Sequence, residues 1–225
     1  MIQRIYHGSK DIIEKPKFGY GKPYNDYGLG FYCTDSIEMA KEWGVSIDRD
    51  GYANIYDIDM SSLAILDLND ENYGILHWLA VLLKNREFDA VSPLAAEAKE
   101  YISNTFKIDY SSADIMIGSR ADDSCFSFAQ DFINGTISYR QLNNAMHLGK
   151  LGQQIVLKSK EAFERIRFVG CETAKQDEWY KKKMQRDKTG RREYFNVEHN
   201  RRQRGDLYIT AILDEKMKPD DPRLR

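Results

Sequence analysis

Two short stretches near the N-terminus carry the side chains best suited to chemistry. A strand-like segment ends in Tyr6, His7, Gly8 and Ser9, and a Gly-Leu-Gly-Phe-Tyr stretch follows at positions 28–32. An imidazole at a strand end can hydrogen-bond to a sugar hydroxyl, and the backbone beside a glycine can pair with a planar amide. An aromatic ring can stack on a flat heterocycle. The two stretches together predict a clamp around an amide-bearing ring and its sugar.

Each stretch also has a simpler interpretation. A single histidine at a strand end is more often structural, and the Gly-x-Gly lacks the third glycine and the strand–helix context of a dinucleotide-binding turn. In the functional interpretation, Gly28 and Gly30 turn the chain tightly, so that Tyr32 lies beside the ligand. Trp43, at the far end of a helix predicted over residues 36–44, would form a second aromatic wall.

The order of these stretches resembles the ADP-ribosyltransferase fold of the diphtheria-toxin and poly(ADP-ribose) polymerase branch. In that branch a strand carries His-Gly-Ser or His-Gly-Thr, and a later Gly-x-Gly-Ile-Tyr-Phe-Ala-Asp segment precedes a helix with a second aromatic residue. This chain has His-Gly-Ser at 7–9, Gly-Leu-Gly-Phe-Tyr-Cys-Thr-Asp at 28–35, and Trp43. It also resembles a narrower bacterial family of uncharacterised proteins through three motifs: Tyr24–Tyr32, Ala121–Asp123 and Asp220–Arg223.

The resemblance implies a site that takes NAD as co-substrate and breaks its bond between nicotinamide and ribose. His7 would hold the adenosine-side ribose, Gly8 the carboxamide through its backbone, and Ser9 a ribose. Tyr32 and Trp43 would enclose the nicotinamide ring. The implied NAD-binding residues are His7, Gly8, Ser9, Gly30, Tyr32 and Trp43, and the implied catalytic residues are His7, Tyr32 and Gln153.

Gln153 is where the chain departs from the family pattern, which has a glutamate at the start of a late strand, here Gln153–Leu157. A carboxylate accepts a hydrogen bond from the ribose 2′-hydroxyl, stabilises positive charge and deprotonates the acceptor, whereas an amide does only the first well. Hydrogen bonds to that hydroxyl strengthen in the oxocarbenium-like state, so transfer of a single ADP-ribose fits an amide better than chain elongation. Alternatively, Gln153 is a plain strand residue.

Asp122 and Asp123 are the candidates for the missing acid, because they follow a predicted strand that ends at Gly118. The alternative is that they cap the N-terminus of the next helix, which is an equally common use of aspartate.

The chain alternates irregularly between short strands and helices, which predicts a mixed α+β fold rather than a doubly wound parallel sheet. The resemblance implies split antiparallel β-sheets with flanking helices. We expect an ADP-ribosyltransferase-like domain over residues 1–172 and a basic, mostly helical extension over 173–225, with a break near Thr189 and Gly190. The expected strands are 2–6, 52–59, 64–68, 113–117, 153–157 and 165–169, and the main expected helices are 36–44, 73–86, 92–104, 123–133, 138–147 and 206–216.

Composition excludes several classes of protein. There is no run of 18 apolar residues, so no membrane-spanning helix is expected, and the N-terminus lacks the pattern of a secretory signal. The three cysteines are scattered and the four histidines lie far apart, which argues against a disulfide framework and against a metal site. We therefore expect a cytoplasmic protein without a bound metal.

Positive charge is concentrated near the C-terminus. Residues 181–204 hold ten lysines and arginines against three acids, although the whole chain has a net charge of −2. Tyr180, Tyr194 and Phe195 are interleaved with these cations, as in proteins that bind single-stranded nucleic acid. The segment is either a solvated helix face or the binding site of a nucleic acid or an acidic antitoxin.

These observations favour an NAD-dependent mono-ADP-ribosyltransferase, a toxin-like bacterial effector that modifies a protein or a nucleic acid and is restrained by an antitoxin. The first alternative is an NAD-binding module that Gln153 has disabled. The second is a nucleic-acid-binding protein that acts through residues 173–225. Transfer of an RNA 2′-phosphate to NAD uses the same fold, but it would require more cations near His7 than Lys10, Lys15 and Lys17 supply.

Overall fold

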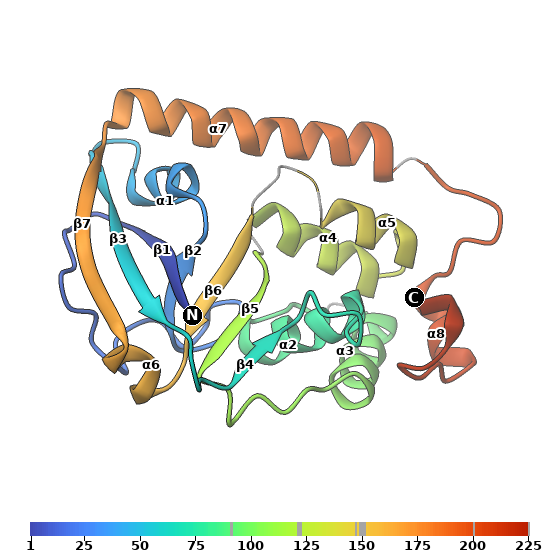
Figure 1. Ribbon diagram of the computed structural model, residues 1–225. Helices are drawn as coiled ribbons and strands as arrows, with labels where there is room; N and C mark the ends of the chain where they lie inside the picture. Colours follow the sequence, from blue (N-terminus) through green and yellow to red (C-terminus); the bar gives the residue numbers. More distant parts are fainter. Residues whose placement is uncertain (91, 121–122, 147, 149–151, 200, 225) are drawn as a thin grey trace.

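A seven-stranded sheet organises the molecule, seen here in a computed structural model that describes all residues except 91, 121–122, 147, 149–151, 200 and 225 (Figure 1). The strand order is β4-β5-β6-β2-β1-β3-β7, and all neighbours are antiparallel except β4 and β5. The strands are β1 (Ile2–Ser9), β2 (Phe31–Thr34), β3 (Gly51–Asp59), β4 (Ile65–Asp67), β5 (Ile115–Ser119), β6 (Gln153–Leu157) and β7 (Ile166–Ala174). The predicted α+β class is confirmed, whereas the described strands form one mixed sheet where the resemblance implies split antiparallel sheets.

The sheet is weakest at its centre. Strand β1 pairs with β3 along its whole length, but its ladder with β2 consists of the single pair Tyr6 and Thr34. Beyond Tyr6 the two central strands therefore leave space between them, and both His7 and Tyr32 border that space.

Helices cover the sheet and begin where their caps predict. The helices are α1 (Ile37–Gly44), α2 (Ile75–Asn85), α3 (Pro93–Thr105), α4 (Asp123–Ile133), α5 (Tyr139–Ala145), α6 (Lys160–Glu164), α7 (Gln176–Glu193) and α8 (Ile209–Asp214). The side-chain hydroxyls of Ser36, Ser92, Ser138 and Ser159 each accept a backbone N–H of the helix that follows. No helix in the described part of the chain is long and apolar enough to cross a membrane.

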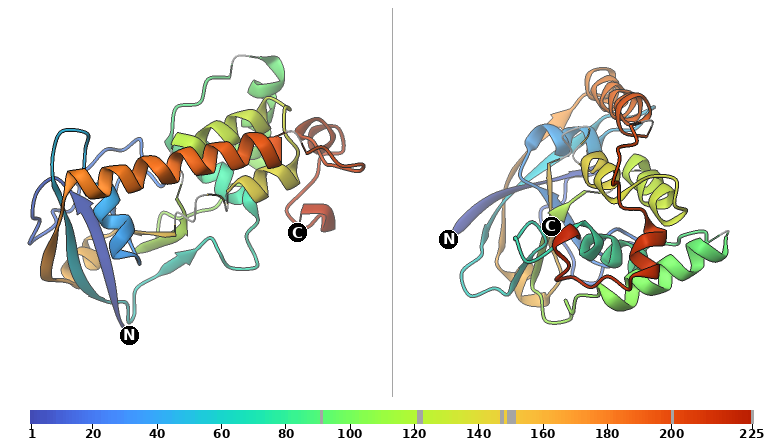
Figure 2. Two further views of the ribbon diagram at one scale, coloured as in Figure 1. Left: turned by 90° about the horizontal axis from the view of Figure 1, so that it is seen from above. Right: turned by 90° about the vertical axis from the view of Figure 1, so that its right-hand side faces the viewer.

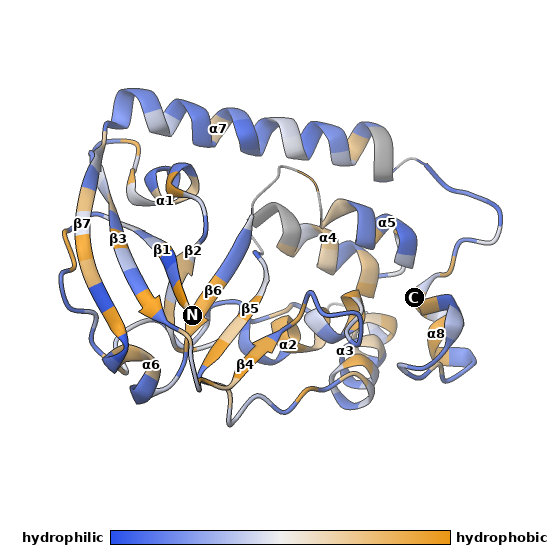
Figure 3. Cartoon of the chain, in the orientation of Figure 1, coloured by the Kyte–Doolittle hydropathy of each residue, from blue (hydrophilic) through white to orange (hydrophobic). Residues whose placement is uncertain are grey.

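Successive side chains along each strand point to opposite faces of the sheet, so the interior is divided into two hydrophobic cores. Tyr32 and Val156 face the larger core, which helices α2 to α5 and α8 cover, whereas Phe31 and Ile155 face a smaller core beside α6. In Figure 3 the strands carry mixed colours, with β4 and β5 largely hydrophobic, and α7 is mostly hydrophilic. Tyr32 is thus held from behind by packed apolar side chains.

The C-terminal segment is part of this body. The predicted boundary at residue 172 falls inside β7, and the buried side chains of Tyr194, Ile209 and Leu213 belong to the larger core. Helix α7 crosses the molecule from the end of β7 past α1 to α4 (Figures 1 and 2).

The predicted break near Gly190 is wrong. Helix α7 runs on to Glu193, and Gly190 is buried within it. A glycine inside a helix costs about 1 kcal/mol relative to alanine, which packing along the helix offsets. Arg186 adds to that packing through an ion pair of 2.7 Å with the buried Glu42 of α1.

Candidate functional site

A pocket of about 660 Å³ opens where β1 and β2 separate, and we call it the β1/β2 pocket. Five of the residues predicted to bind NAD line it together: His7, Gly8, Gly30, Tyr32 and Trp43. They come from three segments, the end of β1, the start of β2 and the end of α1. The predicted clamp is therefore one continuous surface in the folded chain.

His7 is fixed in one tautomer by the neighbouring strand. Its Nδ1 lies 2.6 Å from the carbonyl oxygen of Tyr32, and because a carbonyl only accepts, Nδ1 carries the proton and donates it. In the neutral ring, Nε2 is then an acceptor. Burial lowers the pKa of His7, against the opposing effect of the Tyr32 carbonyl, so the neutral form is favoured at neutral pH. The imidazole stacks on Phe31 with ring centroids 4.3 Å apart.

Tyr32 is fixed by both ends of its side chain. Its ring packs against the larger core, and its hydroxyl accepts the Tyr27 backbone N–H at 3.1 Å and donates to the Gly28 carbonyl at 2.5 Å. Burial raises the pKa of this phenol, so it stays protonated. The hydroxyl therefore shapes the turn at residues 27–28, and the ring is what Tyr32 offers to the pocket.

Trp43 also lines the pocket. The guanidinium carbon of Arg120 lies 4.1 Å from the centre of its ring, within cation–π range. The indole Nε1 of Trp43 is buried and has no hydrogen-bond partner among the described residues. Buried N–H groups are normally satisfied, so a ligand atom that accepts this hydrogen would remove a cost of about 1–3 kcal/mol.

Gly8 has a packing role that the sequence did not reveal. A Cβ atom at this position would lie 2.0 Å from the carbonyl oxygen of Ala40 and 2.8 Å from Cβ of Trp43. The glycine therefore lets helix α1 approach β1 closely, which brings Trp43 to the pocket wall.

Ser9 does not line the pocket. Its hydroxyl donates a hydrogen bond to the Asp11 carbonyl and accepts one from Nδ2 of Asn54 at 3.0 Å. Asn54 is fully buried, and its amide also bonds the backbone of His7, Asp11 and Ile13, so it ties the loop after β1 to β3. Ser9 thus takes part in holding this loop rather than in forming the pocket surface.

The glutamine that lines the β1/β2 pocket is Gln154 rather than the predicted Gln153. Gln153 is exposed, whereas the next residue, Gln154, is buried and lines the β1/β2 pocket. The register explains the difference, since Gln154 lies opposite Thr34 on the same face of the sheet as Tyr32. Its Oε1 is buried and, like Nε1 of Trp43, has no partner among the described residues.

Charged groups give the pocket a positive lining. Lys15, Lys17, Arg86 and Arg120 lie on its wall, and Asp26 is the one acid among its described lining residues. Asp26 forms an ion pair with Arg86 at 3.1 Å. Such a surface suits a ligand with more than one negative charge, such as a diphosphate.

The side chains of the predicted auxiliary acids are not among those that the structure describes. Asp122 lies outside the described residues, as does the side chain of Asp123, whose backbone starts α4. Within the described part of the chain, no group of three histidine, cysteine, aspartate or glutamate side chains is placed to hold a metal ion.

Sequence reasoning missed Gln154, Arg86 and Arg120. Arg86 directly follows α2 and Arg120 directly follows β5, and the ends of elements are positions where site residues gather. That signal was present in the sequence, but only the fold brings these positions to His7.

Residues 3–168 match the model of a protein family described as a protein of unknown function, DUF3990. No curated protein and no solved structure matches the chain.

Proposed function

The chain belongs to this DUF3990 family of unknown function, and we propose that it is an NAD-dependent mono-ADP-ribosyltransferase with an ADP-ribosyltransferase-like fold. The observation that carries the proposal is the shared pocket: His7 and Gly8, Gly30 and Tyr32, and Trp43 converge on one cavity although they lie in separate segments.

The pocket offers a partner for each part of NAD. The nicotinamide ring lies against Tyr32 and Trp43, and Nε2 of His7 accepts a ribose hydroxyl. Arg86 and Arg120 face the diphosphate. Oε1 of Gln154 accepts the hydrogen of the nicotinamide-ribose 2′-hydroxyl, which satisfies a buried atom that otherwise has no described partner.

In the reaction, the bond between the nicotinamide nitrogen and the anomeric carbon breaks, and its electron pair stays with nicotinamide. The resulting oxocarbenium character is stabilised by the hydrogen bond between Gln154 and the 2′-hydroxyl. A nucleophilic oxygen or nitrogen of the acceptor then forms the new bond and releases its proton to solvent. Transfer of a single ADP-ribose to an acceptor that is already nucleophilic fits an amide at this position.

The test is release of free nicotinamide when purified protein is incubated with NAD and a cell extract that supplies acceptors. We expect release by the wild-type protein and about tenfold less by Trp43→Ala, because one aromatic wall is lost. Phe195→Ala is the control, since Phe195 is 54% exposed and is not a lining residue of the pocket. Equal release by Trp43→Ala and wild type would contradict the proposal.

A toxin-like role in bacteria belongs to the same proposal. Expression in a bacterium should then arrest growth, and Trp43→Ala should relieve the arrest in proportion to its loss of nicotinamide release. Arrest that persists with Trp43→Ala would separate toxicity from this pocket.

A second candidate is an NAD-binding module without turnover. It is favoured by the lack of an available carboxylate: the one acidic residue in the described lining, Asp26, is paired with Arg86. Calorimetric titration with NAD separates the two candidates, because saturable binding without nicotinamide release in any extract supports the module.

A further inference from the structure

The outer wall of the β1/β2 pocket is a loop in which cations and aromatic rings alternate. Residues 15–25 read Lys-Pro-Lys-Phe-Gly-Tyr-Gly-Lys-Pro-Tyr-Asn, with three lysines, three aromatic residues and no acid. Several of them, including Lys15, Lys17, Tyr20 and Tyr24, line the pocket itself. We call this segment the basic aromatic loop.

Two rings of this loop are held outward. Tyr20 is 78% exposed and Tyr24 is 67% exposed. Tyr20 sits between Gly19 and Gly21, whose φ angles of +77° and +145° are costly for other residues, so the backbone itself turns this ring away from the core. Phe18 is 52% exposed and differs from them in packing edge-on against Phe163.

The lysines of the loop are available to a partner. Neither Lys15, Lys17 nor Lys22 forms an ion pair with a described residue. Nζ of Lys17 lies 5.8 Å from the centre of the Tyr20 ring, so cation and ring are presented side by side. Grooves for single-stranded nucleic acid combine these two features, with bases stacked on rings and phosphates beside cations.

We propose that the basic aromatic loop binds single-stranded nucleic acid and presents it as the acceptor at the mouth of the pocket. Bases stack on Tyr20 and Tyr24, while the three lysines neutralise the phosphates. The binding stands on the loop alone, whereas the transfer rests on the proposed function. An acidic peptide would pair with the lysines but has no flat faces to cover the two rings, which is why nucleic acid is the favoured partner.

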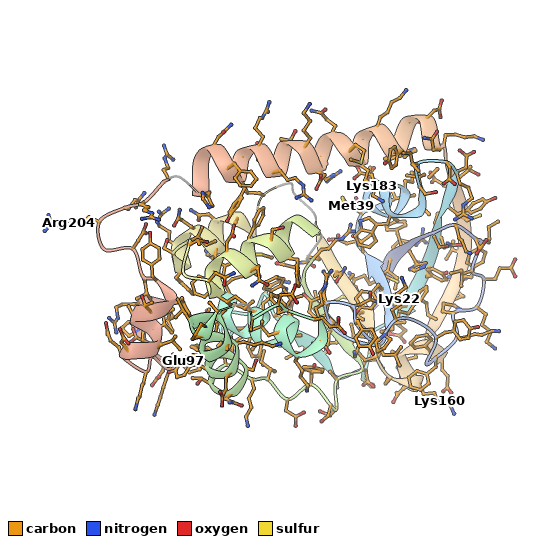
Figure 4. The ribbon with its side chains drawn as sticks, turned by 180° about the vertical axis from the view of Figure 1, so that it is seen from behind. Lys22, Met39, Glu97, Lys160, Lys183 and Arg204 are labelled. Carbon is orange, nitrogen blue, oxygen red and sulfur yellow. The ribbon has the colours of Figure 1, made fainter. Side chains whose placement is uncertain are left out.

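The C-terminal basic segment is the competing surface for the same polyanion. Figure 4 shows Arg204 at the edge of the molecule, away from Lys22 on the loop, whereas Lys183 on α7 lies above Lys22 in this view. The loop and the C-terminal cations belong to different elements, so each set of residues can be substituted by itself.

The first experiment contains no NAD, so it does not depend on the proposed function. A fluorescent oligouridylate or oligothymidylate of about 15 nucleotides is titrated with the full chain, and binding is followed by anisotropy. The double variant Tyr20→Ser with Tyr24→Ser should bind at least about tenfold more weakly, because each stacked base contributes strongly. Phe195→Ser, an exposed ring beside the C-terminal cations, is the matched control and should change affinity less than about twofold.

The contribution of the lysines is tested by measuring oligonucleotide binding at several salt concentrations. Lys15→Gln with Lys17→Gln and Lys22→Gln should weaken binding and flatten its dependence on salt concentration, since fewer counterions are released. Wild-type affinity in the double tyrosine variant, or loss of binding only in Phe195→Ser, would overturn the proposal. Displacement of the oligonucleotide by polyglutamate at equal charge concentration would likewise favour an acidic protein partner and overturn it.

A parallel titration with NAD separates this inference from the proposed function. Because Tyr20 and Tyr24 also line the pocket, the double tyrosine variant should lose some NAD affinity, but its loss of oligonucleotide affinity should be at least about threefold larger. If NAD affinity falls about tenfold and oligonucleotide affinity does not, the rings cover the donor and the nucleic-acid proposal is wrong. If the oligonucleotide binds as expected but NAD does not bind wild type, only the proposed function fails.

Discussion

Two pockets of similar size lie on either side of the end of β5, and they differ in chemistry. The β1/β2 pocket has about 660 Å³ and includes Arg120 in its wall, while a second pocket beside the start of α2 has about 770 Å³ and includes Ser119. We call the second one the α2 pocket. Its described lining holds the acid Glu71 and no lysine or arginine. The α2 pocket is the larger of the two, so volume does not distinguish the candidate NAD site, whereas the positive lining and the convergence of the predicted residues do.

Each pocket also holds a histidine, and the two have opposite hydrogen-bond polarity. His7 donates from Nδ1 to a carbonyl, which leaves Nε2 as an acceptor. His77 in the α2 pocket accepts the Gly74 backbone N–H at Nδ1, so in the neutral ring its Nε2 carries the proton. His77 thereby caps the N-terminus of α2. The same residue type is structural in one pocket and offers a free acceptor in the other.

The largest contrast between the pockets should come from their tyrosines. We expect Tyr32→Ala to weaken NAD binding by about a hundredfold or more, since it removes the ring and the hydroxyl that holds the turn at Gly28. Tyr73→Ala in the α2 pocket should change it less than about twofold. Calorimetric titration of both variants checks this, and equal losses would show that the two pockets were wrongly distinguished.

The histidines give the next contrast. His7→Ala should weaken NAD binding about thirtyfold, roughly 2 kcal/mol for a lost acceptor and lost packing, while His77→Ala should leave it unchanged. Because burial lowers the pKa of His7 in the fold below its usual 6.5, the ring stays neutral at pH 6.5, and NAD affinity should be constant until the pH falls to this lowered pKa and should decrease below it, where the ring becomes protonated.

The free energy of unfolding should change in the pH range just above this one. Between the lowered pKa of His7 and 6.5 the unfolded chain binds more protons than the folded one, so the free energy of unfolding decreases as the pH falls through this range and is constant above it. Burial lowers the pKa of His77 as well, and it contributes in the same direction. NAD affinity against pH is therefore the discriminating measurement, and an affinity that rises on acidification would contradict the assigned tautomer.

Gln153 and Gln154 provide a contrast within one strand. Gln154→Glu places a carboxylate in the β1/β2 pocket and should raise the rate of nicotinamide release about tenfold, because a carboxylate stabilises the developing positive charge. Gln153→Glu adds the same charge at an exposed position and should have no effect. Initial rates at saturating NAD decide this, and an increase with Gln153→Glu alone would restore the original sequence prediction.

The smallest expected contrast concerns the acids of the two pockets. Asp26→Asn releases Arg86 from its ion pair and should raise NAD affinity about threefold at low salt, an effect that fades as salt is added. Glu71→Gln in the α2 pocket should leave affinity within error. Titrations at two salt concentrations test the pair, and a decrease with Asp26→Asn would mean that Asp26 positions Arg86 for the ligand.

The elements of the fold were largely accessible from the sequence, because their signals are local. Helix α4 and strand β6 have the predicted bounds, since periodicity and flanking glycines mark them. The alternation of side chains along β6 defines the two faces of the strand, but it does not say which face borders the β1/β2 pocket. Only the pairing of Gln154 with Thr34 settles that, and this pairing is set by tertiary structure.

Two other differences have the same origin. The low helix propensity of Gly190 predicts a break in the helix, but the packing of α7 outweighs that propensity. The glycines and prolines of residues 15–25 predict a loop, but how far Tyr20 and Tyr24 protrude depends on the surfaces that the loop covers. The sequence therefore indicates the local structure of each segment, but it does not indicate which distant segments pack against it.

The path of the C-terminal segment has a practical consequence for anyone who divides this gene product. A fragment cut where the family match stops, at residue 168, would interrupt the edge strand β7 and remove the rings and aliphatic chains of Tyr194, Ile209 and Leu224 from beneath the helical layer. The remaining fragment would expose a hydrophobic surface to water and would therefore tend to aggregate. The smallest unit that can be handled alone therefore extends well past the segment that the family model matches.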